Sequence, residues 1–264
     1  MTLAISASPD LFRMVAAYTR LEVRRALRNR RYQMFSIGFP VVFYLLYTGV
    51  LQGSTARADA RIDGILWPAY FMVSMAAYGA IGAALAGSRV IATERSSGWT
   101  RQLRITPLPP AAYVLVRLVV SSITTIPALV LVLAAGALVN GVSLTPPEWV
   151  AAFAGLALGS LPFAALGILI GYVFDADSAQ GGMMVTYFGL AILGGLWAPV
   201  ASFPSVLVTI AHVLPSYHFA NLAWQALAGH APDPVDVAIL LAWAAAFGVL
   251  VIWRYRAEEQ RQGA

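Results

Sequence analysis

The chain has 264 residues, of which 59% are hydrophobic and only 11% are charged, and its formal net charge is +5. Soluble domains carry about a quarter charged residues, and a chain of this length has too little interior to hide so many apolar side chains from water. The composition therefore excludes an ordinary water-soluble domain and predicts an integral membrane protein.

All 17 basic residues are arginines. A phosphate-binding loop of the GxxxxGK[ST] type needs its lysine on the β- and γ-phosphates, so this chain cannot bind ATP through that motif. We expect neither an enzyme nor a cofactor or metal site in the chain. Cysteine is absent, which excludes disulfides and thiolate metal ligands. The arginines lie beside hydrophobic segments, a pattern that indicates contact with membrane lipid rather than with nucleic acid.

Residues 10–31 are predicted to form an amphipathic helix in the membrane interface. On a helical wheel the apolar side chains share one arc and the arginines share the adjoining arc, so the basic face can meet anionic lipid head groups. A basic cytosolic extension of the first span is the alternative. The apolar arc contains Leu11, Met14, Val15, Tyr18 and Leu21, and the basic arc contains Arg13, Arg20, Arg24, Arg28 and Arg31.

Six apolar segments are long enough to cross a membrane, since a helical span needs about 20 mostly apolar residues. None has an acidic residue or an arginine away from its ends. Proton- or sodium-coupled transporters usually need ionisable groups near the bilayer midplane, so we expect neither mechanism here. The predicted fold is an all-α membrane domain over residues 1–264. Its spans are predicted at 33–53, 65–88, 112–139, 148–172, 181–201 and 235–254.

The arginines also orient the spans. They concentrate before the first span, in the loop after the second span and after the last span. With six spans these three segments lie on one side, and their excess of arginine marks that side as cytoplasmic. Both termini are therefore predicted in the cytoplasm. The loop with Asp175 and Asp177 is acidic and is predicted on the same side, where we expect both carboxylates to be solvated.

Two predicted spans carry small residues at four-residue spacing. In lipid such stripes let helix backbones approach closely, because packing drives helix association there. The spacing predicts close packing and does not discriminate between functions. The stripes are Gly79, Ala83 and Gly87 in the second span, and Gly155, Gly159, Gly167 and Gly171 in the fourth.

A polar segment, residues 89–108, separates the second and third spans. We expect a short helix here, with Glu94 and Arg95 facing solvent or a partner, broken at Gly98 and ended by Pro107. A short helix held between two spans would offer a soluble partner a rigid point on which to push. An ordinary charged loop is the alternative.

Residues 202–230 are apolar but interrupted by prolines. We expect short re-entrant helices that pack on the bundle, because irregular backbone at membrane depth persists only when it is buried in protein or faces water. Asn221 is one of the few polar residues here and is a candidate for a substrate path. We interpret His212 and His218 as residues at an aqueous boundary rather than as metal ligands.

The first predicted span carries an aromatic side chain at every fourth position. This stripe could line a path for an apolar substrate, or it could pack against other helices or face lipid, and both interpretations remain open. It consists of Phe35, Phe39, Phe43 and Tyr47.

The segment from Glu94 to Leu118, "ERSSGWTRQLRITPLPPAAYVLVRL", resembles the cytoplasmic segment of type-2 ATP-binding-cassette (ABC) permeases. The pattern is an acidic residue, a glycine, a leucine, Thr-Pro-Leu, and an aromatic and a basic residue that open the next helix. "PFAALGILIGY" and "LPSYHFANL" further along are also similar to this family, as found in multidrug efflux permeases of the daunorubicin-resistance type. The matching residues are Glu94, Gly98, Leu103, Thr106, Pro107, Leu108, Tyr113 and Arg117.

The resemblance implies the permease half of an ABC exporter in the inner (plasma) membrane of a bacterium. Two such chains would pair as a homodimer, and two copies of a separate ATPase subunit would bind ATP and magnesium. The polar segment would be the coupling helix, in contact with the ATPase or the amino-terminal helix, with Gly98 as a tight packing point. The residues assigned to coupling are Glu94, Arg95, Gly98, Arg101, Leu103, Thr106 and Pro107.

The same resemblance favours efflux of drugs or other amphipathic small molecules, since the Glu-Ala-Ala loop of importer relatives is not seen in this sequence. Export of a polysaccharide or of a lipid-linked substrate is the alternative within transport. A membrane receptor or scaffold without an ATPase is the alternative outside transport.

Overall fold

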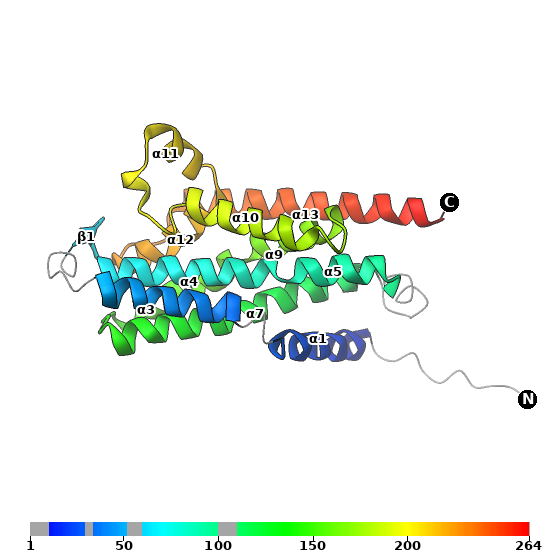
Figure 1. Ribbon diagram of the computed structural model, residues 1–264, viewed down its shortest axis with the longest axis horizontal. Coiled ribbons are helices and arrows are strands. Elements are labelled where there is room, and N and C mark those ends of the chain that lie inside the picture. The colour runs from blue at the N-terminus through cyan, green and yellow to red at the C-terminus, as the bar shows by residue number, and fades with distance from the viewer. Residues whose placement is uncertain (1–10, 30–33, 52–59, 100–109, 264) are drawn as a thin grey trace, which may run out of the picture.

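In a computed structural model the chain is almost entirely helical over the residues that the structure describes, which are 11–29, 34–51, 60–99 and 110–263. Most of the helices run along one axis as an elongated bundle (Figure 1). Within these ranges the strands are β1 (Arg61–Ile62) and β2 (Ile65–Leu66), which form a small antiparallel hairpin at one end of the bundle. The all-α fold predicted from the sequence is confirmed.

The helices overlap the predicted spans, but α10 ends at Leu193 rather than at residue 201, and α13 continues to Gly263 rather than to residue 254. In chain order the α-helices and two short helices of other types are α1 (Leu11–Leu27), the π-helix η1 (Met34–Gly38), α3 (Phe39–Leu51), α4 (Trp67–Leu85), α5 (Gly87–Ser96), α7 (Pro110–Val139), α8 (Pro146–Gly159), α9 (Leu161–Val173), α10 (Ala179–Leu193), the 3-10 helix η2 (Val200–Ser202), α11 (Ser205–Ala211), α12 (Pro215–Leu227) and α13 (Pro234–Gly263).

Four helical stretches among the described residues are long and apolar enough to cross a membrane, namely Trp67–Ser96, Ala112–Val139, Pro146–Val173 and Pro234–Ala257. The first and fifth predicted spans coincide instead with shorter apolar helices, Ser36–Gly49 and Ala179–Leu193. The protein is therefore multi-pass, and the count of six spans stays a prediction. Part of the first predicted span, at residues 33 and 52–53, lies outside the described residues.

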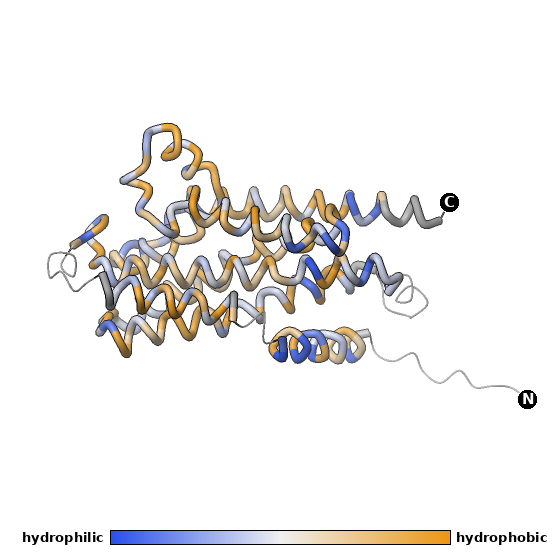
Figure 2. Tube along the Cα trace, in the orientation of Figure 1, coloured by the Kyte–Doolittle hydropathy of each residue, from blue (hydrophilic) through white to orange (hydrophobic). Residues whose placement is uncertain are grey.

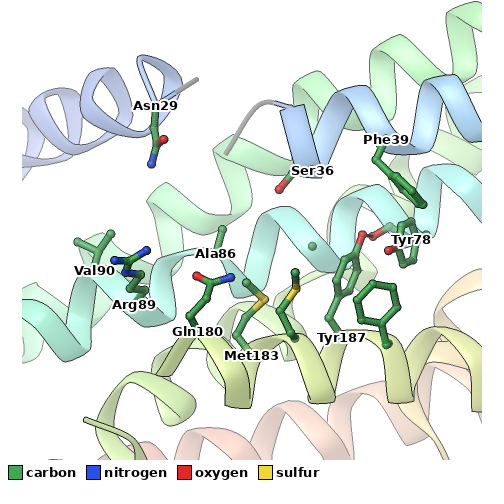
Figure 3. A pocket seen from close by; sticks show the side chains of 13 residues that line it. Asn29, Ser36, Phe39, Tyr78, Ala86, Arg89, Val90, Gln180, Met183 and Tyr187 are labelled. Atoms are coloured by element: carbon green, nitrogen blue, oxygen red, sulfur yellow. Dashed lines mark hydrogen bonds between the residues drawn. The ribbon is translucent and has the colours of Figure 1, made fainter. Parts of the chain in front are cut away.

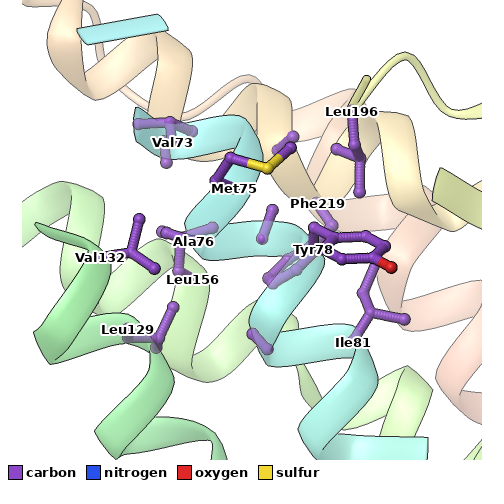
Figure 4. Packing of buried hydrophobic residues seen from close by; sticks show 14 of the residues in the cluster. Val73, Met75, Ala76, Tyr78, Ile81, Leu129, Val132, Leu156, Leu196 and Phe219 are labelled. Carbon is purple, nitrogen blue, oxygen red and sulfur yellow. The ribbon is translucent and has the colours of Figure 1, made fainter. Parts of the chain in front are cut away.

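Helix α4 forms the centre of the bundle. It packs against α3, α7, α9 and α12. The most apolar part of the stretch Trp67–Ser96, which combines α4 and α5, is 94% buried, against 22% for that of Pro234–Ala257 in α13. Figure 4 shows Met75 and Ile81 of α4 among side chains from neighbouring helices, including Leu129 of α7 and Phe219 of α12. A helix that is apolar on every side is expected at the centre of a membrane bundle.

The predicted small-residue stripes lie at close helix contacts. A Cβ atom built on Gly167 of α9 would lie 2.8 Å from the backbone oxygen of Ala84 in α4. On Gly171 it would lie 2.7 Å from the Ser88 oxygen in α5, and on Gly159 of α8 it would lie 2.7 Å from the Phe219 ring in α12. These distances are too short for a side chain, so the glycines allow the backbone contact that the spacing predicted.

The predicted fourth span is two consecutive helices rather than one. Helices α8 and α9 are separated at Ser160, whose hydroxyl donates to the Ala157 oxygen at 2.7 Å. Pro162 lies in the first turn of α9, where its missing N–H leaves no helical bond unmade. The predicted re-entrant segment likewise contains two helices, α11 and α12, at an angle of 81° to each other.

Hydrophilic residues gather at one end of the bundle, on α1, at the end of α5 and toward the end of α13 (Figure 2). Helix α1 lies beside the bundle at this end and packs against α7 (Figure 1). The hairpin lies at the opposite end, close to the last turns of α12, where Trp224 stacks on Tyr70 of α4. We call these two ends the α1 end and the hairpin end.

Candidate functional site

Three helices meet at the α1 end through a group of ionic side chains. Arg117 of α7 donates from Nη2 to Glu94 Oε1 of α5 at 2.6 Å, and from Nη1 to Glu22 Oε2 of α1 at 2.7 Å. The hydroxyl of Tyr113 donates to Glu94 Oε2 at 2.8 Å. Arg25 of α1 adds a longer contact, 3.3 Å from Nη1 to Glu94 Oε1. We call these five residues the Arg117 cluster.

The three central members of the Arg117 cluster are buried, since Glu22, Glu94 and Arg117 are each 5% exposed. A buried charge is tolerated only when it is paired and hydrogen-bonded, and removal of one partner leaves the other uncompensated at a cost of about 3–5 kcal/mol. One guanidinium with a carboxylate on either side meets this requirement. The cluster therefore ties α1, α5 and α7 to one another at fixed positions.

Two further polar atoms at the cluster are not used by the hydrogen bonds named above. They are the hydroxyl of Tyr18 on α1 and Nε of Arg117, and both are buried. Burial raises the pKa of Tyr18 to about 12, although the nearby Arg117 guanidinium acts in the opposite direction. The phenol therefore stays neutral and adds no charge to the cluster.

The structure corrects the expected surroundings of Glu94. The sequence predicted that its carboxylate faces solvent or a partner, whereas it lies against Arg117 inside the protein. The prediction failed because Arg117 lies one helical turn or more inside the third span, and the sequence alone gives no sign that its side chain turns toward α5. The alternative prediction, contact with the amino-terminal helix, agrees with the Arg25 contact.

Arg95 joins α5 to the end of α9. Its Nη1 donates to the backbone oxygen of Gly171 at 2.7 Å, and its guanidinium lies 5.2 Å from the centre of the Tyr172 ring. Both residues are in the last turn of α9, where backbone oxygens lack helical donors and attract a cation. Arg95 therefore fastens α5 to the end of α9.

Gly98 ends the helical run as predicted, but it is not a tight packing point within the described residues. A Cβ atom built on it would meet no atom within 4 Å. Its φ of 72° explains the glycine instead, because side chains disfavour this left-handed backbone. Four further residues assigned to coupling, Arg101, Leu103, Thr106 and Pro107, lie outside the described residues.

A pocket of about 300 Å³ lies between α4 and α10, with α3 and the end of α1 at its edge. Figure 3 shows Arg89 and Gln180 together at one end of it, and Tyr187, Tyr78 and Phe39 toward the other. The Tyr187 ring stacks on Tyr78 at 4.3 Å. We call this the α4–α10 pocket. It is lined by Asn29, Ser36, Phe39, Tyr78, Gly82, Ala86, Arg89, Val90, Gln180, Met183, Met184, Tyr187 and Phe188.

The α4–α10 pocket and the Arg117 cluster lie on two sides of the same helix junction. A second cavity of about 200 Å³ is lined by Glu22, Arg25 and Arg117 of the cluster, and it shares Ala86 and Val90 with the α4–α10 pocket. Ala86 is the residue at which α4 gives way to α5. A molecule in the pocket would therefore touch the helix that holds Glu94.

The aromatic stripe of the first predicted span lies partly against the core and partly beside the α4–α10 pocket. The Phe43 and Tyr47 rings pack on Phe71 of α4, at 6.2 and 4.6 Å, and are partly buried against the core. Phe39 stacks on Phe43 at 5.5 Å but is exposed and lines the α4–α10 pocket. The Phe35 side chain is not among those that the structure describes.

The hairpin end contains a second buried polar group, which the sequence analysis missed. Asp236 of α13 accepts from Asn221 Nδ2 at 2.8 Å and from Gln225 Nε2 at 3.2 Å, and it lies 2.6 Å from His218 Nδ1. The other ring nitrogen of His218 donates to the His212 backbone oxygen at 2.8 Å. His218 is thus buried and bonded rather than placed at an aqueous boundary.

A sequence signal for this group exists. Residues 218, 221 and 225 are separated by three and four positions, so their side chains share one face of α12 and can reach the same carboxylate. Asn221, assigned above to a substrate path, is held by this bond. It also lines a cavity of about 360 Å³ beneath the hairpin, which we call the hairpin pocket.

The described residues contain no group of three or more histidine or acidic side chains arranged to hold a metal ion. Asp175, one of the two loop carboxylates, accepts from the Ser178 hydroxyl and from its N–H at 2.8 Å before α10. These bonds lower the pKa of Asp175. Asp175 and Asp177 are both exposed, as predicted.

Comparisons with known proteins agree with this arrangement. Residues 61–253, from the hairpin to α13, match the family described as "ABC-2 family transporter protein". The chain is also 33% identical over 240 residues to "Putative transport permease YvfS" of Bacillus subtilis (strain 168), a match that covers 90% of this chain and 95% of that protein.

Proposed function

This chain belongs to the ABC-2 family of transporter proteins, and from that premise we propose that it is the permease subunit of an ATP-driven exporter. Membership implies an ABC transporter system with an ATPase partner, and the missing Walker lysine agrees with ATP hydrolysis in another chain. The exporter consists of two copies of this chain and two ATPase subunits that bind ATP and magnesium. The α1 end faces the cytoplasm, and the membrane is the inner (plasma) membrane of a bacterium.

The observation that carries the mechanism is the Arg117 cluster. A push by the ATPase on the segment that begins with α5 reaches Glu94, and through Arg117 it reaches α7 and α1 together. Buried ion pairs resist separation, so the three helices move as one body rather than one at a time. The force thus rocks the bundle as a whole against its partner copy.

The α4–α10 pocket is the cytoplasmic part of the substrate path in this proposal. Its volume of about 300 Å³ is at the lower end of the range for small-molecule sites. Ala86 and Val90 belong both to the pocket wall and to the start of α5. Binding of a substrate in the pocket and movement of the coupling segment can therefore favour the same conformation of the permease. A substrate shifts the conformational equilibrium only by its difference in affinity between the two states.

Co-purification tests the proposed function. The tagged permease, extracted in mild detergent from its own membrane, should bring a soluble subunit with a Walker motif in equal number, and ATP hydrolysis by the complex should exceed that of the subunit alone. Persistent absence of such a subunit would support a receptor or scaffold instead. Extrusion of a polysaccharide or lipid-linked carrier by the complex, without small-molecule efflux, would support that alternative substrate.

A further inference from the structure

We propose that the α4–α10 pocket selects amphiphiles with an anionic head group and that Arg89 is the counter-ion of that head. This inference rests on the proposed function, and it names the substrate class of the same site. A drug with a cationic amine would instead require an acidic counter-ion in the pocket.

The body of the pocket suits an apolar molecule of irregular shape. Phe39, Tyr78 and Phe188 supply aromatic walls, and Met183 and Met184 supply flexible thioethers. Methionine side chains adapt to different apolar ligands, and aromatic rings give a large contact area at low entropic cost. This part of the pocket therefore selects the size and hydrophobicity of the ligand but not its charge.

The end of the pocket near Arg89 determines the charge of the ligand that the pocket accepts. Arg89 is exposed, and its guanidinium pairs with no carboxylate among the described residues. The two amides at this end, Asn29 and Gln180, add hydrogen-bonding groups without charge, and none of the described lining residues is acidic. A cationic head would meet a guanidinium and no counter-charge, whereas a carboxylate, sulfonate or phosphate could accept its hydrogen bonds.

The acidic residues on neighbouring elements do not reverse this balance. Glu22 and Glu94 are already paired with Arg117 on the other side of the helix junction. Asp175 and Asp177, in the loop ahead of α10, are exposed and lie outside the pocket lining. Among the described residues that line the pocket, Arg89 is the one charged side chain.

The hairpin pocket lacks a guanidinium among its described lining residues and contains a carboxylate instead. The carboxylate is that of Asp63, and the lining also includes the histidines His212 and His230 and the aromatic residues Tyr70, Tyr217 and Trp224. An anionic amphiphile held at the α1 end would thus lose its arginine partner at the hairpin end and meet the Asp63 carboxylate there. A ligand that binds more weakly on the release side leaves more readily, which suits export.

The test uses two fluorescent dodecyl amphiphiles that differ only in the head group, a sulfonate or a trimethylammonium. They are titrated against the permease–ATPase complex in phosphatidylcholine nanodiscs. The sulfonate should bind about tenfold more tightly, as a charge-assisted hydrogen bond predicts. Arg89→Gln should remove this preference and Arg89→Glu should reverse it. Arg256→Gln, at an exposed arginine of α13 outside the pocket, should leave it unchanged.

Equal or tighter binding of the ammonium, or an unchanged ratio in Arg89→Gln, would overturn the inference. So would complete displacement of the sulfonate by phosphatidylglycerol in the nanodisc, since the pocket would then be a lipid site. These outcomes are separable from failure of the proposed function. A complex that extrudes the ammonium probe in an ATP-dependent way would still be an exporter, and a chain without an ATPase partner could still show the binding preference.

Discussion

Arg117 Nη2 and Glu94 Oε1 are 2.6 Å apart, although 23 positions and a change of helix separate the two residues. This contact joins the polar segment between the second and third spans, at Glu94, to the start of the third span, at Arg117. Because Arg117 also binds Glu22 of α1, the amino-terminal helix and the coupling segment share one buried cation. The predictions below test this arrangement and the packing around it.

Removal of the charge at Glu94 should lower both the stability of the protein and its coupling to the ATPase. Glu94→Gln keeps the size of the side chain but leaves Arg117 with one carboxylate, so we expect a loss of about 3 kcal/mol in stability. ATPase stimulation by the permease should fall with it. Thermal unfolding in detergent and ATP hydrolysis by the complex measure the two effects. The control is Asp177→Asn, at an exposed carboxylate, and an equal loss in this variant would contradict the role of the cluster.

Sequence alone predicted a large part of this fold. The apolar segments, the glycine spacing and the break at Gly98 are local features, and the structure agrees with each. The partners of Arg117 and of Asp236 are not local. They depend on how α1 and α12 dock against distant helices, and no spacing within one segment encodes that docking. For this reason Glu94 was predicted at the surface and His218 at an aqueous boundary.

The contact between α9 and α5 should not tolerate a side chain at Gly171. Gly171→Ala places a Cβ atom 2.7 Å from the Ser88 backbone oxygen and from Ile91 Cβ, so we expect a loss of about 1–3 kcal/mol from overpacking. Gly248→Ala in α13, where a Cβ atom meets nothing within 4 Å, should instead be neutral or stabilising by up to about 1 kcal/mol. Melting temperatures compare the two. Similar melting temperatures would argue against the close approach of α9 and α5.

Gly98 should be required for its backbone and not for its small size. Asparagine adopts the left-handed conformation more readily than other side chains, so Gly98→Asn should retain most of the stimulated ATPase activity. Gly98→Val should lose it, because a β-branched residue strongly disfavours a φ of 72°. Equal loss in both variants would show that the small size of glycine, and not its backbone conformation, is required at this position.

Substitution of Asp236 by asparagine should destabilise the protein far more than the same substitution of its neighbour Asp233. Asp236 is buried and accepts from two amides beside His218, so Asp236→Asn replaces one of its two acceptor oxygens by an N–H donor and leaves the partners of that oxygen unmatched. We expect a loss of about 1–3 kcal/mol for each unmatched group. Asp233 accepts from the Val235 N–H at an exposed helix start, where asparagine serves equally well. Asp233→Asn should therefore melt like the unmodified protein, and a matching loss would contradict the assignment.

The most direct test of the central claim is the distance between α1 and α5 during ATP turnover. The chain contains no cysteine, so Arg24→Cys and Ser96→Cys introduce the two spin-label sites, both of them exposed, without background. Labelled chain is diluted with unlabelled chain, and the distance within one chain is measured in the complex with and without trapped ATP. This distance should stay constant while the Ser96-to-Ser96 distance between the two copies changes. A change in the α1-to-α5 distance on ATP binding would contradict the movement of α1 and α5 as one body.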